Sequence, residues 1–457
     1  MSMQRYTRYR DSMVQWLGQV PEHWRVSPLK HLVSLSSGGT PSKDNRDFWD
    51  GDVPWASAKD LKSEKLVDTI DHITRFAVES GCANMVPAGN ILVVVRGMIL
   101  ARTFPVVEIL EPMAINQDLK GVRPREYLHS RFLAWLLRGS AAESLLRLDE
   151  AGHGTKALRM EAWTSMQLPV PPLDEQSAIA TFLDRETEKI DTLIVEQEKL
   201  IALLTEKRQA TILHAVTCGL NSDVPMKDTG AKWLGQVPAH WGVGVLTRIA
   251  ERVVVGIAEA ATHAYVDEGI PILRSTNIRA GRIIGEILHI NQAFAAERGS
   301  KLINAGDLIT VRTGNAGVTA VIPLELNQCQ CFTMLITTLR RPNSANYYCY
   351  WMNSEAAQRY FALEGWGTAQ VNISVPILKA LPVAIPPGEE QSAIASFLDR
   401  ETAKFDALKA EAERAVELLK ERRSAMIAAA VTGKIDVRNA VATTAPPAVS
   451  PSPLLVE

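Results

Sequence analysis

The chain has 457 residues, of which 46% are hydrophobic and 22% are charged, and its formal net charge at pH 7 is −2. This length leaves room for two or three domains, and the composition is that of an ordinary globular protein. A net charge near zero excludes a protein that is basic overall, so any nucleic-acid-binding surface must be local. No apolar run reaches the length of about eighteen residues that spans a membrane, so we expect no transmembrane segment.

The first predicted element is a short aromatic lead, RDSMVQWLGQVPEHW (Arg10 to Trp24), which returns as KDTGAKWLGQVPAHW (Lys227 to Trp241). A domain of about 140 residues follows each lead, so the chain consists of two copies of one unit. In each domain a β-branched run, ILVVV or LITV, follows Ala-Gly and a polar residue and predicts a buried strand. Helical stretches such as residues 130–148 lie between short strands, which indicates mixed α/β domains.

The loops differ between the two domains and hold the candidate binding residues. The first domain has a glycine-rich loop, residues 37–43, whose N–H groups, hydroxyls and lysine suit phosphate contacts, although a plain surface turn explains it equally well. The second has an Arg- and Asn-rich segment, residues 274–282, of the side chains that read base edges; a solvated face is the alternative. The candidate DNA-binding residues are Ser37, Gly38, Gly39, Thr40, Ser42, Lys43, Lys59, Arg96, Thr155, Lys156, Arg274, Ser275, Thr276, Asn277, Arg279, Arg312, Thr313, Asn315, Thr368 and Gln370.

After each domain a long helix is predicted, with QSAIATFLDRETEKIDTL (Gln176 to Leu193) repeated as QSAIASFLDRETAKFDAL (Gln391 to Leu408). Paired prolines and acidic residues precede each copy and mark a helix start. The first helix, about residues 175–216, has a predicted length of roughly 60 Å. The predicted pairing residues, spaced by alternating steps of four and three, are Ile179, Leu183, Ile190, Leu193, Leu200, Leu204, Ile394, Leu398, Phe405, Leu408 and Leu419.

The two helices are expected to pair with each other. They share one register, and the domain between them connects the end of the first to the start of the second, which makes them antiparallel. The alternative is two unrelated amphipathic helices on separate cores. Beyond the second helix, residues 436–457 are rich in Pro, Ala and Ser and predict a disordered tail.

Catalytic signatures are missing from the sequence. It has no GxxxxGK[ST] phosphate loop, no Asn-Pro-Pro-Phe/Tyr methyltransferase motif and neither half of the common nuclease site, Pro-Asp and Glu-x-Lys. The five cysteines show no framework spacing, which suits a reducing cytoplasm, and Cys329-x-Cys331 fits two same-face strand residues better than half a metal site. We therefore expect no catalytic residue and no metal site.

With these motifs the chain resembles the specificity subunit of type I restriction-modification systems. The resemblance extends over nearly the whole chain except the tail. It is carried by the WLGQVP lead, by SGGTPS (Ser37 to Ser42) followed by GDVPWASAKDL, by VRTGNAG (Val311 to Gly317) and above all by LPVPPLDEQSAIATFLDRET (Leu168 to Thr187) with its second copy. Met13 departs from the glycine usual in the lead, whereas Gly230 keeps it, and the second domain lacks the SGGTPS loop.

This resemblance implies two target recognition domains, each reading one half of an asymmetric split DNA site, joined by antiparallel helices that receive two DNA methyltransferase subunits. It implies no catalysis by this chain. It places S-adenosylmethionine, ATP and Mg on partner subunits, with a motor and restriction subunit as a further possible partner. Two alternatives remain: an orphan DNA-binding or defence-complex module, and a coiled-coil scaffold that does not touch DNA.

The predicted domain boundaries follow the repeat. They are a lead and recognition domain in residues 1–168, a central helix in 169–220, a second lead and recognition domain in 221–383, a C-terminal helix in 384–435 and the tail in 436–457.

Overall fold

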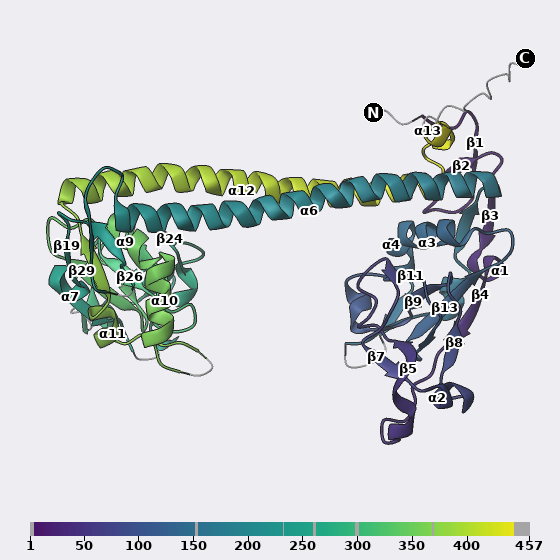
Figure 1. Cartoon of the computed structure of the whole chain (residues 1–457), viewed down its shortest axis with the longest axis horizontal. Helices are drawn as coiled ribbons and strands as arrows, with labels where there is room; N and C mark the ends of the chain where they lie inside the picture. The colour runs from purple at the N-terminus through teal and green to yellow at the C-terminus, as the bar shows by residue number, and fades with distance from the viewer. Residues whose placement is uncertain are drawn as a thin grey trace, which may run out of the picture. The chain divides into compact units, whose positions relative to one another are not determined.

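A computed structural model describes residues 4–150, 154–231, 233–258, 262–297, 301–367 and 370–442. The chain divides into two compact units, which we call unit 1 (residues 1–196 with 415–457) and unit 2 (residues 197–414). Each unit holds one mixed α/β domain and a part of each of two long helices, α6 (Leu173–Cys218) and α12 (Gly388–Val431) (Figure 1). The predicted fold class is confirmed.

The domain of unit 1 contains two main sheets. Residues Ile91 to Val94, which form the central strand of the larger sheet, are 0% exposed, as the apolar run predicts. The larger sheet has the order β4-β13-β9-β11-β6, formed by β4 (Val33–Ser37), β13 (Leu119–Pro124), β9 (Ile91–Val94), β11 (Val106–Ile109) and β6 (Lys65–Leu66). The second has the order β7-β5-β12-β8, formed by β7 (Asp71–Ile73), β5 (Trp49–Ala56), β12 (Met113–Ile115) and β8 (Asn84–Val86). Helix α3 (Ser130–Gly139) packs on β11.

The domain of unit 2 repeats this plan. Its first sheet has the order β20-β29-β26-β27, formed by β20 (Ala250–Val255), β29 (Leu335–Leu339), β26 (Leu308–Thr310) and β27 (Thr319–Val321). Its second has the order β21-β25-β22-β28, formed by β21 (Tyr265–Val266), β25 (Leu288–Ile290), β22 (Ile270–Leu273) and β28 (Gln330–Cys331). β4 pairs with β13, the strand before helix α3, and β20 pairs with β29, the strand before the counterpart helix α9 (Ala345–Met352). The sequence had left this strand order open.

Each lead forms a small hairpin, and each domain closes with a strand that continues into a long helix. The hairpins are β1 (Tyr9–Asp11) with β2 (Gln19–Pro21) and β17 (Met226–Asp228) with β18 (Gln236–Pro238). The closing pairs are β3 (Arg25–Pro28) with β16 (Gln167–Val170) and β19 (Gly242–Val245) with β30 (Pro382–Ile385). The remaining helices are α1 (Leu29–Leu32), α2 (Arg75–Glu79), α4 (Ala141–Leu145), α5 (Met160–Thr164), α7 (Leu246–Ile249), α8 (Gln292–Glu297), α10 (Glu355–Glu364), α11 (Val375–Lys379) and α13 (Arg438–Ala442), with short 3-10 turns between them.

In unit 1 the two long helices run antiparallel. Asp191 of α6 accepts a hydrogen bond from Arg423 Nε of α12 at 2.8 Å. Glu175, near the start of α6, lies 3.6 Å from Arg438, which follows the end of α12. The start of one helix therefore lies beside the end of the other.

In unit 2 the same orientation holds. Arg208 Nε of α6 donates to Asp406 of α12 at 3.0 Å. Val216, near the end of α6, shares a hydrophobic core with Leu398, near the start of α12. The predicted antiparallel pairing is thus confirmed in each unit.

The predicted helix seam is right near the domains and wrong along the middle. Ile179, Leu183, Ile190, Ile394 and Leu398 are buried, and Leu204, Phe405 and Leu419 are half-buried. By contrast, Leu193, Leu200 and Leu408 are 45%, 43% and 50% exposed, so they do not lie in the seam.

The error has a geometric cause. The buried residues of the first helix step from Ile179 to Leu183, Thr187 and Ile190, and the sequence had not placed Thr187 in the seam. Thr402 holds the same position in α12. Steps of four, four and three correspond to about 3.67 residues per turn, close to a straight α-helix, whereas the assumed heptads need 3.5. The helices therefore depart from the heptad positions at Leu193, Leu200 and Leu408, whereas Leu204, Phe405 and Leu419 remain half-buried.

The prediction of a disordered tail from residue 436 is wrong for its first part. Residues Arg438–Ala442 form α13, and Val437 is 1% exposed. The Asp436 N–H donates to the Gln4 carbonyl at 2.8 Å, which ties this segment to the N-terminal one. Residues 443–457 lie outside the described residues.

Candidate DNA interface

The glycine-rich loop of unit 1 owes its glycines to close packing. A Cβ on Gly38 would lie 1.9 Å from the Ile115 carbonyl oxygen, and one on Gly39 would lie 2.3 Å from that of Cys82. The Gly39 N–H already donates to the Ile115 oxygen at 2.9 Å. This N–H is therefore unavailable to a phosphate, contrary to the role predicted for the backbone of this loop.

Other groups of this loop are exposed. The side chains of Ser42 and Lys43 face solvent. Thr40 donates to the Gln117 side chain, and the Lys120 ammonium, which the sequence did not single out, contacts the Ser37 hydroxyl. Lys43 and Lys120 are thus two of the cations on this surface.

Arg96 and Lys156 of unit 1 lie on one small sheet, and Thr155 directly precedes it. The sheet has the order β10-β15-β14, formed by β10 (Arg96–Gly97), β15 (Lys156–Leu158) and β14 (Leu148–Glu150). Arg96 faces Ala157 in the register, which places it beside Thr155 and Lys156. Lys156 also forms a 2.7 Å ion pair with Glu150. Lys59, by contrast, lies in another loop and pairs with Asp71 at 2.6 Å.

Unit 2 brings together the corresponding segments. The Thr313 hydroxyl donates to the Asn372 side chain at 2.5 Å, and the Asn372 amide donates to the Gln370 carbonyl at 3.2 Å. Arg312 and Asn315 lie in the same loop as Thr313, whereas Thr368 lies outside the described residues. Trp366, which is 57% exposed, pairs with Asn372 through the backbone. Sequence reasoning missed this tryptophan, although an aromatic residue beside polar loop residues could have indicated it.

The Arg- and Asn-rich segment of unit 2 is divided between structure and surface. Asn277 is 2% exposed, and its amide donates to the Ile284 and Glu286 carbonyls at 3.0 Å each. Its side-chain oxygen accepts from the Arg274 N–H. Its side chain is thus committed to the turn and cannot read a base in this conformation. Ser275, Thr276 and Arg279 are exposed.

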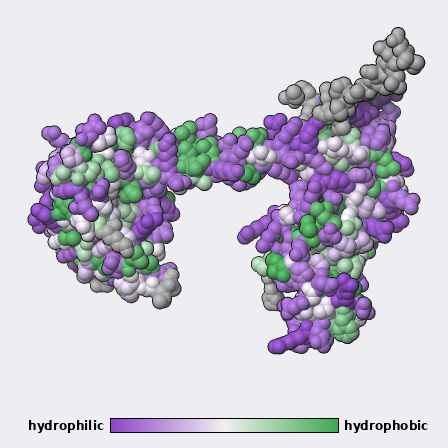
Figure 2. All heavy atoms as spheres, viewed as in Figure 1, coloured by the Kyte–Doolittle hydropathy of each residue, from purple (hydrophilic) through white to green (hydrophobic). Residues whose placement is uncertain are grey.

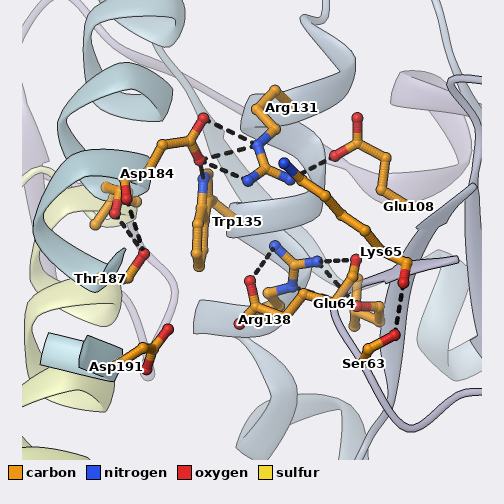
Figure 3. A network of polar contacts seen from close by, with 12 residues as sticks. Ser63, Glu64, Lys65, Glu108, Arg131, Trp135, Arg138, Asp184, Thr187 and Asp191 are labelled. Carbon is orange, nitrogen blue, oxygen red and sulfur yellow. Dashed lines mark hydrogen bonds and ion pairs between the residues drawn. The ribbon is translucent and has the colours of Figure 1, made fainter. Parts of the chain in front are cut away.

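A charged network joins the domain of unit 1 to its helices (Figure 3). Arg131 forms ion pairs with Asp184 of α6 at 2.8 Å and with Glu108 of β11 at 2.6 Å. Trp135 Nε1 donates to the same Asp184 at 2.7 Å. Three guanidinium groups lie 4.7–5.9 Å from the Trp135 ring, those of Arg131, Arg138 and Arg423.

This network is mostly buried, and its pKa values reflect that. Burial lowers the pKa of Arg138 to about 10, against the opposing effect of Glu64. Burial also acts to lower the pKa of Arg131, but hydrogen bonds to Asp184 and Glu108 outweigh it and raise that pKa. Both guanidinium groups therefore stay charged at neutral pH, and their acidic neighbours offset the cost of burying that charge.

The same junction in unit 2 is hollow. Counting from the repeat that aligns Gln176 with Gln391, Asn346, Tyr350 and Asn353 replace Arg131, Trp135 and Arg138. A cavity of about 330 Å³ lies there, lined among others by Asn346 and Asp399. Asp399 accepts a hydrogen bond from Tyr350 at 2.7 Å.

The described residues offer little else for chemistry. They contain no group of three His, Cys, Asp or Glu side chains that could hold a metal ion, and none of their helices is both long and apolar enough to cross a membrane. Burial raises the pKa of Cys329 and of Cys349 to about 12, so neither thiol is a ready nucleophile. The exposed features are instead cations, hydroxyls and amides on loops, which suit DNA contacts.

Comparison with known proteins gives a consistent result. The family model for the type I restriction modification DNA specificity domain matches residues 21–202 and 261–418. The chain is 31% identical over 195 residues to the EcoR124I/EcoR124II specificity subunit of Escherichia coli, covering 42% of this chain and 46% of that one. It is 22% identical over 440 residues to the EcoKI specificity subunit of Escherichia coli K12, covering 92% and 90%.

Two solved structures share the fold. One comes from work on complex assembly and conformational transition of the type I R-M system; it has a TM-score of 0.65 at 18% identity and covers 90% of this chain and 98% of that one. The other is the HsdS subunit from Thermoanaerobacter tengcongensis, with a TM-score of 0.52 at 17% identity, covering 91% and 98%.

Proposed function

The chain belongs to the family of type I restriction-modification specificity subunits, and from this premise we propose that it reads a bipartite, asymmetric DNA target and holds two methyltransferase subunits. Specificity subunits of this family bind DNA, serve defence against foreign DNA and are non-catalytic. The chemistry, with S-adenosylmethionine, ATP and Mg, is assigned to the partner subunits.

One observation carries the proposal of two-part reading. The two domains share the order of four strands in one sheet and of three strands in the other, β4-β13-β9-β11 with β20-β29-β26-β27 and β7-β5-β12 with β25-β22-β28. Both end in a closing strand, but their loops differ at corresponding places. In both, a segment after the central strand meets a segment that precedes the closing strand: Arg96 pairs with Ala157 in unit 1, and Thr313 contacts Asn372 in unit 2. Equal frames with unequal loops suit two domains that approach DNA in the same way and read different sequences.

The proposed docking surfaces are exposed leucines on the long helices. In unit 1, Leu193 and Leu418 are 45% and 65% exposed, and in unit 2, Leu203 and Leu408 are 62% and 50% exposed. Asp191 faces Arg423 in unit 1, and Arg208 faces Asp406 in unit 2. The two exposed leucines of each unit therefore lie on neighbouring turns of the two helices. Figure 2 shows hydrophobic residues gathered on the exposed surface of α6 and α12.

The repeat relates these two surfaces. Leu193 corresponds to Leu408, and Leu203 corresponds to Leu418, so each unit carries one leucine of each kind. Two equivalent apolar surfaces suit two copies of one partner. We assign both to the methyltransferase subunit, because the family acts with that enzyme.

We further propose that the helices set the spacing between the two half-sites. The 46 residues of α6 correspond to about 69 Å at 1.5 Å per residue, comparable with about 20 base pairs at 3.4 Å. This length suits two domains that read major grooves about one turn or more apart.

Methylation mapping of cells that carry the chain with a methyltransferase subunit tests this function. We expect a methylated motif of two specified parts separated by unspecified bases. A chain that binds duplex DNA but copurifies with no methyltransferase is an orphan module. A chain whose duplex binding shows no steep salt dependence is a scaffold, and the DNA function is then wrong.

Native mass spectrometry tests the docking surfaces. The double variant Leu203→Glu/Leu408→Glu removes one surface and Leu193→Glu/Leu418→Glu removes the other. Each is expected to reduce the methyltransferase stoichiometry from two copies to one, because a buried unpaired carboxylate opposes association. Retention of two copies by both variants contradicts the assignment.

A further inference from the structure

A second cavity in unit 2 lies between the long helices and a short hairpin of the domain. The hairpin consists of β23 (Ile278–Arg279) and β24 (Arg282–Ile283). The cavity has a volume of about 440 Å³. Four of its lining side chains are cations and one is a carboxylate, namely Arg208, Arg279, Arg282, Lys409 and Asp406.

The single carboxylate does not neutralise this groove. Asp406 lies between two arginines, 3.0 Å from Arg208 and 3.4 Å from Arg282. Lys409 has Glu413 at 3.9 Å, and both side chains are partly exposed, so solvent weakens that pair. The lining of the groove therefore has a net positive charge.

Arg279 is the most available of these cations. Its guanidinium donates to two backbone carbonyls, those of Thr276 at 3.2 Å and Ile278 at 2.9 Å. Among the described residues no carboxylate forms an ion pair with it, and its side chain is exposed. A guanidinium held by neutral acceptors keeps its charge and free N–H groups for an anion.

At the corresponding place in unit 1, the cations are paired with acids. Arg423 corresponds to Arg208, but it lies between two acids, Asp191 and Glu64. Ile194 stands where unit 2 has Lys409. The Lys409 side of the groove thus has no counterpart in unit 1, where the corresponding arginine is paired with two acids.

We propose that this groove binds a phosphate of the DNA backbone, with Arg279 and Lys409 as its main contacts. The inference rests on the proposed DNA-reading function and adds a contact where the domain meets the helices. The exposed Ser275 and Thr276 hydroxyls lie in the segment leading to Arg279, so the contact extends the predicted recognition surface of unit 2. A phosphate contact fixes the position of the domain on the duplex but does not select the sequence.

Duplex binding by the full chain, with and without its methyltransferase partner, tests the groove. The variants are Arg279→Gln, Lys409→Gln and their combination. Lys404→Gln is the matched control, because Lys404 is an exposed lysine of α12 that pairs with Glu401 at 2.6 Å and does not line the groove. Affinity is measured against salt concentration on the methylated motif and on an unrelated duplex.

Each groove variant is expected to lower the salt slope by about 0.9 and the double variant by about 1.8, with roughly five- to tenfold weaker binding per contact at 0.1 M salt. The loss should be equal on both duplexes, and the methylated motif should not change. Inorganic phosphate, compared with chloride at equal ionic strength, should compete more strongly with the original chain than with the double variant.

Two negative results are distinguishable. If the original chain shows no salt-dependent duplex binding, the DNA function itself fails. If it binds but Arg279→Gln and Lys409→Gln behave like Lys404→Gln, the groove proposal is overturned and the function stands.

Discussion

Glu175 joins three parts of unit 1 that are far apart in the sequence. It is 5% exposed and lies in the first turn of α6. Its carboxylate accepts hydrogen bonds from Trp24 Nε1 at 2.9 Å and from the Tyr6 hydroxyl at 3.1 Å, and lies 2.6 Å from His23 Nε2. Arg438, beyond the end of α12, lies 3.6 Å away. Burial and the charge of Glu175 raise the pKa of Tyr6, so this hydroxyl remains a donor.

The substitution Glu175→Gln keeps the shape of the side chain but removes its charge. Its amide oxygen can accept from some of these donors, while its NH₂ group faces others. Buried hydrogen bonds to a charged group contribute about 1.5–3 kcal/mol each, and Arg438 is half-exposed and contributes less. We expect a loss of about 2–4 kcal/mol, which lowers the melting temperature by about 5–15 °C for a unit of this size.

The repeat supplies the matched control, Glu390→Gln in unit 2. Glu390 has two corresponding partners, His240 at 2.7 Å and Trp241 at 2.9 Å, but its side chain is 41% exposed. Because solvent replaces part of what is lost, we expect a loss of about 0.5–1.5 kcal/mol.

Scanning calorimetry of the full chain measures both effects, and hydrogen exchange locates them. Glu175→Gln should increase exchange in residues 4–11 and 433–440, and Glu390→Gln should not. Equal destabilisation by both variants, or unchanged protection of the two terminal segments, refutes the reasoning.

Three further predictions follow from the repeat. Asn346→Arg should fill the cavity of unit 2, pair with Asp399 and raise the free energy of unfolding by about 0.5–1 kcal/mol in urea titration. A free energy of unfolding below that of the original chain contradicts this expectation. Met13 has a φ of 58°, so Met13→Gly should raise the free energy of unfolding by about 1 kcal/mol. Gly230 has a φ of 66°, so Gly230→Met should lower it by a similar amount; an unchanged melting temperature in either variant contradicts this. Seven residues inserted after Glu196 and at the facing turn of α12 should lengthen the unspecified spacer by about three base pairs, and an unchanged motif counts against the helices as a ruler.

The repeat made the fold predictable. Near-identical leads and helix copies gave the two units, the mixed α/β class and the antiparallel helices, because connectivity alone brings the end of one helix near the start of the other. The seam was harder: heptad steps placed Leu193 and Leu408 inside, but a nearly straight helix turns Thr187 and Thr402 inward. Buried threonines satisfy their hydroxyls with the carbonyl four residues earlier, which sequence spacing does not reveal.

The candidate interface was predictable by segment but not by atom. The loops at Arg96 and Thr313 were identified because they follow buried strands. Asn277 and Gly39 were misjudged, because each uses its polar group on the backbone of a neighbouring segment, and such tertiary hydrogen bonds have no local signal. The cavity at Asn346 depends on which side chains meet across the junction, and such tertiary packing has no local signal in the sequence.

The central claim, that two domains read two halves of one target, is tested most directly by exchanging residues 25–165 for the corresponding domain of another specificity subunit and mapping the methylated motif. The account predicts that one half of the motif changes while the other half and the spacer remain. A change in both halves would contradict it.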